Sequence, residues 1–168
     1  MASSNNSSAL PAVRDAVAQL PLPVIPQLEG AAWYTHTSLY GARHQPFEAK
    51  EGEDVLDYER LEHVGDALLG AEVTLLLVKA TLVSNQTLAI ISSRLGFPSQ
   101  LRAAAAQLYQ LRINPLVQAS MFEAYLAQLH IEKGHSAFQS FVTSLYSSLV
   151  PVVVQAFRSA KPAAPTAA

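Results

Sequence analysis

The chain has 168 residues and a formal net charge of −2; half of its residues are hydrophobic and 14% are charged. This balance suits one helical domain with a core of ordinary size and argues against a disordered chain. The lack of cysteine excludes disulfides and thiolate metal sites, and the net charge is not the basic footprint of a protein that binds nucleic acid strongly.

The first 28 residues begin with a small, polar run and contain four prolines. We expect a flexible N-terminal arm over residues 1–28, with room for only a short helix around residues 11–19. An organelle-targeting segment is rich in arginine and poor in acids, whereas Arg14 stands beside Asp15. We therefore expect an intracellular protein of the cytoplasm or nucleus, with mitochondrial import less favoured.

Two further segments precede the most informative part of the chain. Residues 29–41 carry four large apolar side chains and end on a glycine, which predicts a helix beginning near Glu29. Residues 44–54 contain a proline, a glycine and several acids and are expected to form an exposed loop. The next helix is predicted to start at Asp54 or Asp57, because either carboxylate could cap it.

That helix carries three carboxylates among apolar side chains, over residues 58–69 with the sequence YERLEHVGDALL. Their spacing of three and then four places Glu59, Glu62 and Asp66 on one stripe. Clustered carboxylates in a largely apolar helix need cations to stay ionised, because burial and like charges both favour their neutral forms. The spacing alone is more typical of a solvent-exposed stripe on an amphipathic helix.

The remainder of the chain is predicted to be helical. Ser84 or Asn85 caps the next helix, Gly134 separates the last two helices, and Pro151 ends the last one. No run alternates with the period of a strand, so the fold class is all-α. The longest apolar run, residues 67–83, is interrupted by two charges, so no membrane span is expected. The predicted helices cover residues 85–95, 101–111, 116–130 and 136–149.

Four segments resemble motifs of the ribonuclease III family and occur in the family's order within residues 31–142. The string ERLEHVGDALLG resembles its signature helix, NERLEFLGDAVLG, and YTHTSLY resembles AFTHRSY. KATLVSNQTL resembles RASLVSNETL, and ASMFEAYLAQLHIEKG resembles ADAFEALIGAIYLDQG. The resemblance implies an all-α ribonuclease III-like helical endonuclease domain over residues 29–158, followed by a disordered tail over residues 159–168. No segment resembles the family's double-stranded-RNA-binding domain, so we expect a compact variant without it.

The same resemblance implies a metal site. It makes Glu62, Asp66 and Glu123 ligands of Mg²⁺, for which Mn²⁺ can substitute, and it gives Glu59 a supporting role among the four expected catalytic residues. Ser120 stands where the family has a fourth acidic ligand, and the family's acidic EGEL segment has no counterpart here. Because a hydroxyl supplies no carboxylate, we expect weak metal binding and loosened positioning.

Two classes of function remain open. The resemblance implies a Mg²⁺-dependent endoribonuclease that hydrolyses double-stranded or structured RNA. The alternative is a catalytically silent ribonuclease III fold that serves as an RNA-binding or structural component, for example of a mitochondrial ribosome. The retained carboxylates favour catalysis, whereas Ser120 and the missing segment favour the silent fold. A helical interaction protein that converged on one motif is disfavoured by four matching segments.

The resemblance also implies a symmetric homodimer that pairs through the signature helices. Gly65 and Ala67 would allow close backbone approach, and the helix is more apolar than one small core requires. His63 stands where the family usually has a phenylalanine that enters a pocket on the partner; alternatively, it hydrogen-bonds within its own subunit. The expected interface residues are His63, Val64, Gly65, Ala67 and Leu68.

Overall fold

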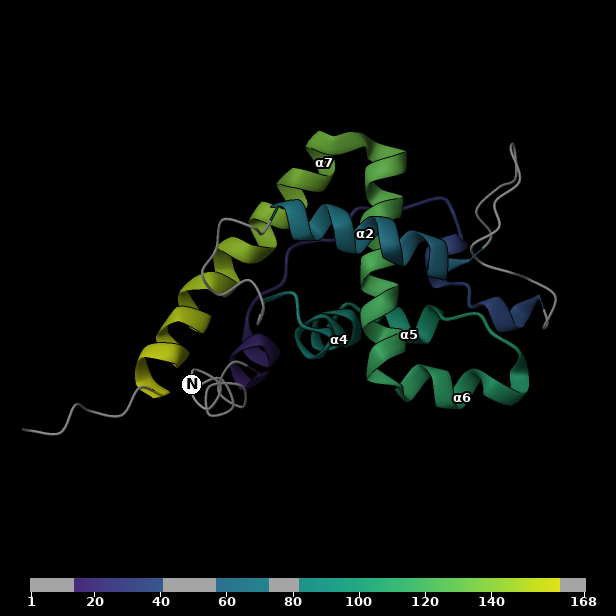
Figure 1. Ribbon diagram of the computed structural model, residues 1–168, viewed down its shortest axis with the longest axis horizontal. Coiled ribbons are helices and arrows are strands. Elements are labelled where there is room, and N and C mark those ends of the chain that lie inside the picture. The colour runs from purple at the N-terminus through teal and green to yellow at the C-terminus, as the bar shows by residue number, and fades with distance from the viewer. Residues whose placement is uncertain (1–13, 41–56, 73–81, 161–168) are drawn as a thin grey trace, which may run out of the picture.

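The computed structural model describes residues 14–40, 57–72 and 82–160, which form helices arranged around one long helix, α7 (Pro115–Ala160). Helices α2 (Tyr58–Glu72) and α4 (Asn85–Arg94) both pack mainly on α7, and α2 crosses it at a steep angle (Figure 1). The short helices α5 (Phe97–Gln100) and α6 (Ala105–Ile113) lie near the first turns of α7. The all-α prediction is confirmed, and the described residues contain one isolated bridge and no strand.

An aromatic cluster joins the first half of α7 to the segments around it. The ring of Trp33 lies 4.7 Å from that of Phe97 and 5.3 Å from that of Tyr125, measured between ring centres. Phe97 and Tyr125 are themselves 4.9 Å apart. Such edge and tilted contacts add to the energy of apolar burial. The cluster therefore fixes the half of α7 that carries Glu123.

Helix α7 bends at Gly134, which has φ 82° and ψ 171°. The predicted separation of two helices at this glycine is confirmed as a kink, because glycine tolerates a positive φ that other residues rarely adopt. The prediction that Pro151 ends the last helix is wrong, since the helix continues to Ala160. Leu149 and Val153 on either side of the proline are completely buried, and their packing offsets the hydrogen bond that proline removes.

By length and composition alone, α7 is apolar enough to cross a membrane, and the described residues contain no second such helix. Its apolar side chains have a different explanation here. Phe138, Val142 and Leu145 are all buried in the core of the domain. A helix that packs on several sides is expected to be apolar around most of its circumference.

The segment expected as one helix from residue 29 is instead two 3₁₀ turns, η1 (Ala32–Tyr34) and η2 (Thr37–Leu39). Between them, Thr35 is extended and forms a parallel bridge with Arg102. The N–H of Arg102 donates to the carbonyl before Thr35, and the N–H after Thr35 donates to the carbonyl of Arg102, each at 2.8 Å. These partners satisfy backbone groups that a continuous helix would pair internally.

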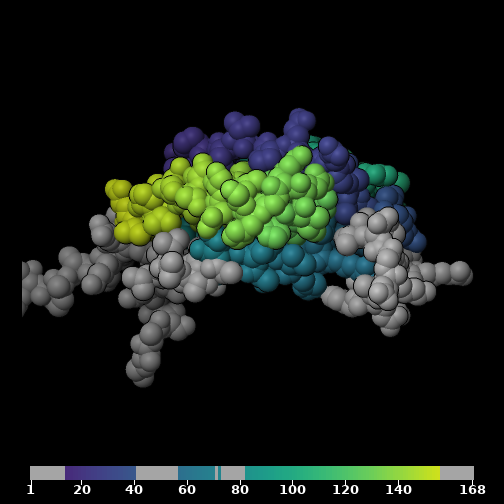
Figure 2. Space-filling model, turned by 90° about the horizontal axis from the view of Figure 1, so that it is seen from above, coloured from purple at the N-terminus to yellow at the C-terminus, as the bar shows by residue number. Residues whose placement is uncertain are grey.

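The N-terminal boundary must move, because residues 14–28 pack on the domain. Residues 14–19 are helical and Val17 is completely buried. Arg94 donates to the carbonyl of Val17 at 2.8 Å, and the hydroxyl of Tyr125 donates to the carbonyl of Pro26 at 3.0 Å. Seen from above, the second half of α7 lies between this segment and α2 (Figure 2). The expected arm of residues 1–28 is therefore wrong for residues 14–28.

Other predictions from the sequence meet different outcomes. Ser84 is confirmed as the cap of α4, since its side chain accepts the N–H of Thr87 at 3.3 Å. The helix predicted over residues 101–111 begins only at Ala105. Residues 159 and 160 still belong to α7 rather than to a tail. Residues 1–13, the loop of residues 44–54 with Asp54, and residues 161–168 lie outside the described residues.

Candidate active site

The start of α2 is held from two directions. The carboxylate of Asp57 accepts the N–H of Glu59 at 3.1 Å, which caps the helix. The N–H of Tyr58 donates to the carbonyl of Thr35 at 2.9 Å. Asp57 is therefore the helix cap among the described residues, and the first acidic residue of α2 follows at a fixed place on the helix.

The backbones of α2 and α7 approach one another closely at Gly65 and Glu123. A Cβ built on Gly65 would overlap the carbonyl oxygen of Glu123 and lie 2.5 Å from its carbonyl carbon. Only a residue without a side chain permits this approach. The crossing places the acidic face of α2 over the glutamate that the sequence predicted as a metal ligand on α7.

Glu123 has an environment that disfavours its charge. It is 7% exposed, and burial raises its pKa to about 8, with further contributions from the charges of Glu62 and Asp66. Burial also raises the pKa of Glu62, while the hydroxyl of Ser120 and the charge of His63 act in the opposite direction. The charges of Glu62 and Asp66 therefore act on Glu123, and these three acids form one electrostatic cluster.

Glu59 lies in the first turn of α2, before Glu62. A residue that the sequence analysis did not identify holds it in place. The hydroxyl of Thr37 donates to Oε1 of Glu59 at 2.8 Å. Thr37 belongs to the YTHTSLY segment, so its place in a family motif was an available signal. Within the same segment, the N–H of Ser38 donates to Nδ1 of His36 at 3.0 Å, and burial lowers the pKa of His36.

Two tyrosines also border the acidic cluster. Burial, with the charges of Glu59 and Glu62, raises the pKa of Tyr58. Burial and the charge of Glu123 likewise raise the pKa of Tyr146, whose hydroxyl donates to the carbonyl of Leu82 at 3.3 Å. Neither tyrosine was expected from the sequence. Both tyrosines therefore stay neutral beside the carboxylates.

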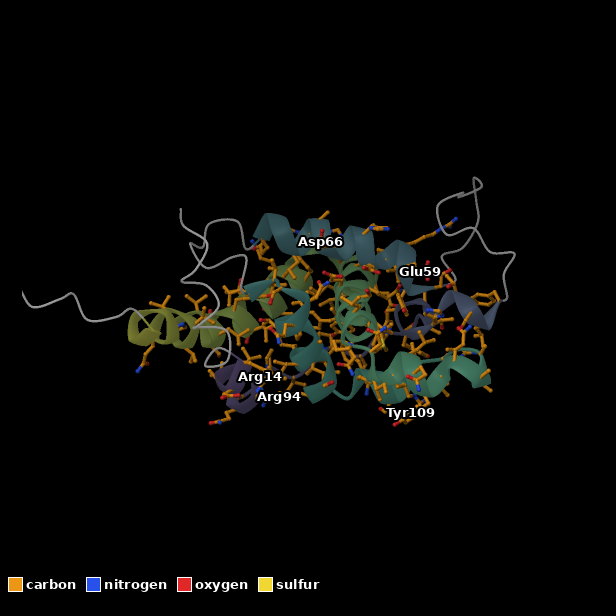
Figure 3. The ribbon with its side chains drawn as sticks, turned by 60° about the horizontal axis from the view of Figure 1, so that its bottom comes forward. Arg14, Glu59, Asp66, Arg94 and Tyr109 are labelled. Atoms are coloured by element: carbon orange, nitrogen blue, oxygen red, sulfur yellow. The ribbon has the colours of Figure 1, made fainter. Side chains whose placement is uncertain are left out.

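The predicted metal ligands differ in how far they are exposed to solvent. Asp66 is exposed on α2, whereas Glu123 is buried beneath it, and Figure 3 shows Glu59 and Asp66 along the same helix. The hydroxyl of Ser120 lies beside Glu62 but also donates to the carbonyl of Leu116 at 3.0 Å. Among the described residues, no three acidic or histidine side chains stand as a complete metal-binding group. The ligand assignment therefore stays a prediction.

The donor set nevertheless suits a hard cation. Carboxylate and hydroxyl oxygens are the ligands that Mg²⁺ prefers, and Mg²⁺ keeps several waters in most protein sites. A cation beside Glu123 would favour its ionised form and oppose the effects of burial and of Glu62 and Asp66. The oxygen donors of these residues therefore suit Mg²⁺ better than a softer metal ion.

Three of the five residues predicted for the dimer interface are exposed on α2. His63, Val64 and Ala67 are exposed on α2, and Val64 is 47% exposed, which is high for a large apolar side chain. Gly65 is instead buried against α7 of its own chain. Its assignment to the dimer interface is corrected, because the close backbone approach that it permits is used within the subunit.

The helices and their crossing form a fold similar to that of ribonuclease III nuclease domains. Two solved structures of the nuclease domain of ribonuclease III from Campylobacter jejuni share this fold. The first, which reports structural flexibility in a region involved in dimer formation, has a TM-score of 0.51 and 20% identity over 79% of this chain and 87% of that chain. The second, at 2.2 Å resolution, has a TM-score of 0.50 and 16% identity over 98% and 99%. No protein-family model and no curated protein matches the chain.

Proposed function

We propose that the chain is a Mg²⁺-dependent endoribonuclease of the ribonuclease III type that acts on double-stranded RNA. The observation that carries this proposal is the buried carboxylate of Glu123, whose pKa is raised to about 8 beside Glu62 and Asp66. A helix crossing that served only as a scaffold would gain stability from an apolar residue at this place. Strongly perturbed acids gathered at one place are typical of functional sites.

In the proposed reaction, Glu62, Asp66 and Glu123 would hold a Mg²⁺ ion. When bound there, the ion would activate a water molecule and neutralise charge that develops on the phosphate. Glu59, held by Thr37, orients water or substrate at the edge of the cluster. Ser120 contributes a hydroxyl where a fourth carboxylate is expected, so the enzyme is proposed to be a weak one.

The proposed partners are double-stranded RNA and a second copy of this chain. The exposed side chains of His63, Val64 and Ala67 form the proposed contact on α2. The description of one similar solved structure refers to a region involved in dimer formation of its nuclease domain. With a net charge of −2, the isolated chain is expected to bind RNA only modestly.

A second candidate is a silent ribonuclease III fold that binds RNA or serves as a structural component. The incomplete metal group among the described residues favours it, as does the serine at position 120. In this case the domain would bind double-stranded RNA without cleaving it. The raised pKa of Glu123 would then mark a residue that is neutral in the working protein.

The deciding experiment incubates the purified full chain with end-labelled double-stranded RNA and either Mg²⁺ or Mn²⁺. Glu123→Gln, prepared in parallel, removes the charge while keeping the shape, and Asp15→Asn changes an exposed acid outside the cluster. We expect cleavage by the wild type and by Asp15→Asn, and none by Glu123→Gln. Binding of RNA without cleavage in either metal would support the silent fold, and equal cleavage by all three proteins would reveal a contaminating nuclease.

A further inference from the structure

Two histidine rings meet at the kink of α7. His130 stands before Gly134 and His135 directly after it, and their ring centres are 5.6 Å apart. His130 is half-buried and His135 is exposed. Both rings also contact Phe138, with ring-centre distances of 5.8 Å and 6.1 Å.

The kink is what brings the two rings together. On an uninterrupted helix, residues five apart point about 140° away from one another, so the two rings could not share a ligand. The positive φ of Gly134 interrupts the helix between them. Phe138 then gives both rings an apolar surface to rest on.

From this geometry we propose that His130 and His135 form a binding site for a borderline divalent cation such as Zn²⁺. Imidazole nitrogens bind Zn²⁺ at about 2.0–2.1 Å, so two rings that share one ion have centres roughly 5–6 Å apart. The observed separation lies in this range.

The remaining coordination positions belong to water. Among the described residues no group of three acids or histidines is placed to hold an ion. The nearby carboxylate of Glu132 is already engaged, because it accepts the N–H groups of Glu29 and Gly30 at 2.9 Å and 2.7 Å and the side-chain amide of Gln128 at 2.7 Å. A site with two protein ligands binds more weakly than a structural site with four.

The ligand type separates this site from the acidic cluster. Imidazole suits Zn²⁺, Ni²⁺ and Cu²⁺, whereas carboxylate and water suit Mg²⁺. An ion held by both histidines would link the two halves of α7 and hold the bend between them. This inference is independent of the proposed nuclease activity, since it uses none of the residues assigned to that activity.

The test is a calorimetric titration of the full chain with Zn²⁺ in the presence of excess Mg²⁺, which competes for carboxylate ligands but not for imidazole. We expect one Zn²⁺ per chain in the wild type, and binding weaker by about tenfold or more in His130→Ala and in His135→Ala. Tyr109→Ala removes an exposed ring on α6 and serves as the matched control, with binding expected to be unchanged. Zn²⁺ should also raise the thermal unfolding midpoint of the wild type but not that of His135→Ala.

A fourth variant tests the role of the kink. Gly134→Ala keeps both histidines but places a side chain on a residue with φ 82°, so it favours a straighter helix and should weaken Zn²⁺ binding. Circular dichroism checks that each variant is folded. Unchanged Zn²⁺ affinity in His135→Ala, or binding lost equally in Tyr109→Ala or Glu123→Gln, would overturn the proposal.

Discussion

The Cα of Gly65 lies against the carbonyl group of Glu123, so the two helices that carry the acidic side chains meet backbone to backbone. This contact leaves no room for a side chain at the crossing. It also brings Glu62 and Asp66 of α2 within electrostatic reach of Glu123 on α7. Close packing and an unfavourable cluster of charges are therefore produced by the same pair of residues.

Gly65→Ala is expected to destabilise the domain. In an open helical position this change would stabilise the protein by about 0.5–1 kcal/mol, but here the added methyl would collide with backbone that cannot move alone. We expect a net loss of about 1–3 kcal/mol in the free energy of unfolding, as is typical of an overpacked core. Urea denaturation measures it, with Val64→Ala on the exposed face of α2 as the control. A stabilised Gly65→Ala protein would show that the helices are further apart.

The sequence predicted the helices wherever local signals decided the structure. The serine cap of α4 and the break at Gly134 rest on neighbouring residues, and both are present. Long-range partners decided the errors. Arg102 takes the backbone bonds that would have continued a helix through Thr35, and burial of Leu149 and Val153 carries α7 past Pro151.

In the candidate site, too, local signals in the sequence predicted some features, and long-range contacts decided the others. Stripe spacing on α2 was enough to group Glu59, Glu62 and Asp66, because periodicity decides which helical residues share a face. Sequence spacing could not show that Gly65 faces α7 of its own chain rather than a partner, since an interior glycine suits either contact. The bond from Thr37 to Glu59 joins residues 22 apart, and no local pattern predicts it.

The stability of the wild type is expected to fall as pH rises, because of Glu123. Its pKa is about 8 in the folded chain, against an ordinary value of 4.5. A carboxyl group whose folded pKa is raised contributes stability below its unfolded pKa and loses it as pH rises through the folded value. Between about pH 4.5 and pH 8 the wild type should therefore lose on the order of 4 kcal/mol.

Glu123→Gln isolates this effect, because its amide stays neutral at every pH while Glu62 is unchanged. Urea denaturation at pH 5 and at pH 9 should show similar stability for both proteins at the lower pH and a more stable variant at the higher pH. Mg²⁺ should recover part of the wild-type stability at pH 9 and none in the variant. Parallel pH profiles for the two proteins would mean that Glu123 is not the group responsible.

Ser120→Asp is expected to raise metal affinity and Mg²⁺-dependent cleavage. The substitution places a carboxylate beside Glu62, where Ser120 now lies, and should strengthen Mg²⁺ binding by about tenfold. Without metal the added charge should destabilise the fold, because it joins an acidic cluster. Ser120→Asn has nearly the same shape without the charge and should improve neither property. If both variants match the wild type in metal binding and rate, the missing acidic segment limits activity instead.

Thr37→Val is expected both to lower the cleavage rate and to destabilise the domain. It keeps the size of the side chain but removes the donor that holds Oε1 of Glu59 at 2.8 Å. Loss of a hydrogen bond to a charged group costs about 1.5–3 kcal/mol, and loose positioning can cost about a hundredfold in rate. Thr37→Ser restores the hydroxyl and should recover most of the rate. Single-turnover kinetics would separate this effect on kcat from weaker RNA binding, and a Thr37→Ser protein as slow as Thr37→Val would argue against the hydroxyl.

The proposed homodimer predicts opposite effects for two neighbouring changes on the exposed face of α2. His63→Phe adds apolar area beside Val64, which is 47% exposed, and burying that area between two copies should strengthen association by about 1–2 kcal/mol, or roughly tenfold. Val64→Glu places a charge in the same contact and should weaken the dimer, because each symmetric pair would bring two like charges together.

Sedimentation equilibrium over a range of protein concentrations measures the association constants of both variants, with circular dichroism as the check on folding. His135→Phe makes the same chemical change at an exposed site on α7 and should leave the association constant unaltered. A wild type that stays monomeric at micromolar concentration, or a Val64→Glu protein that associates as tightly as the wild type, would place any dimer contact elsewhere.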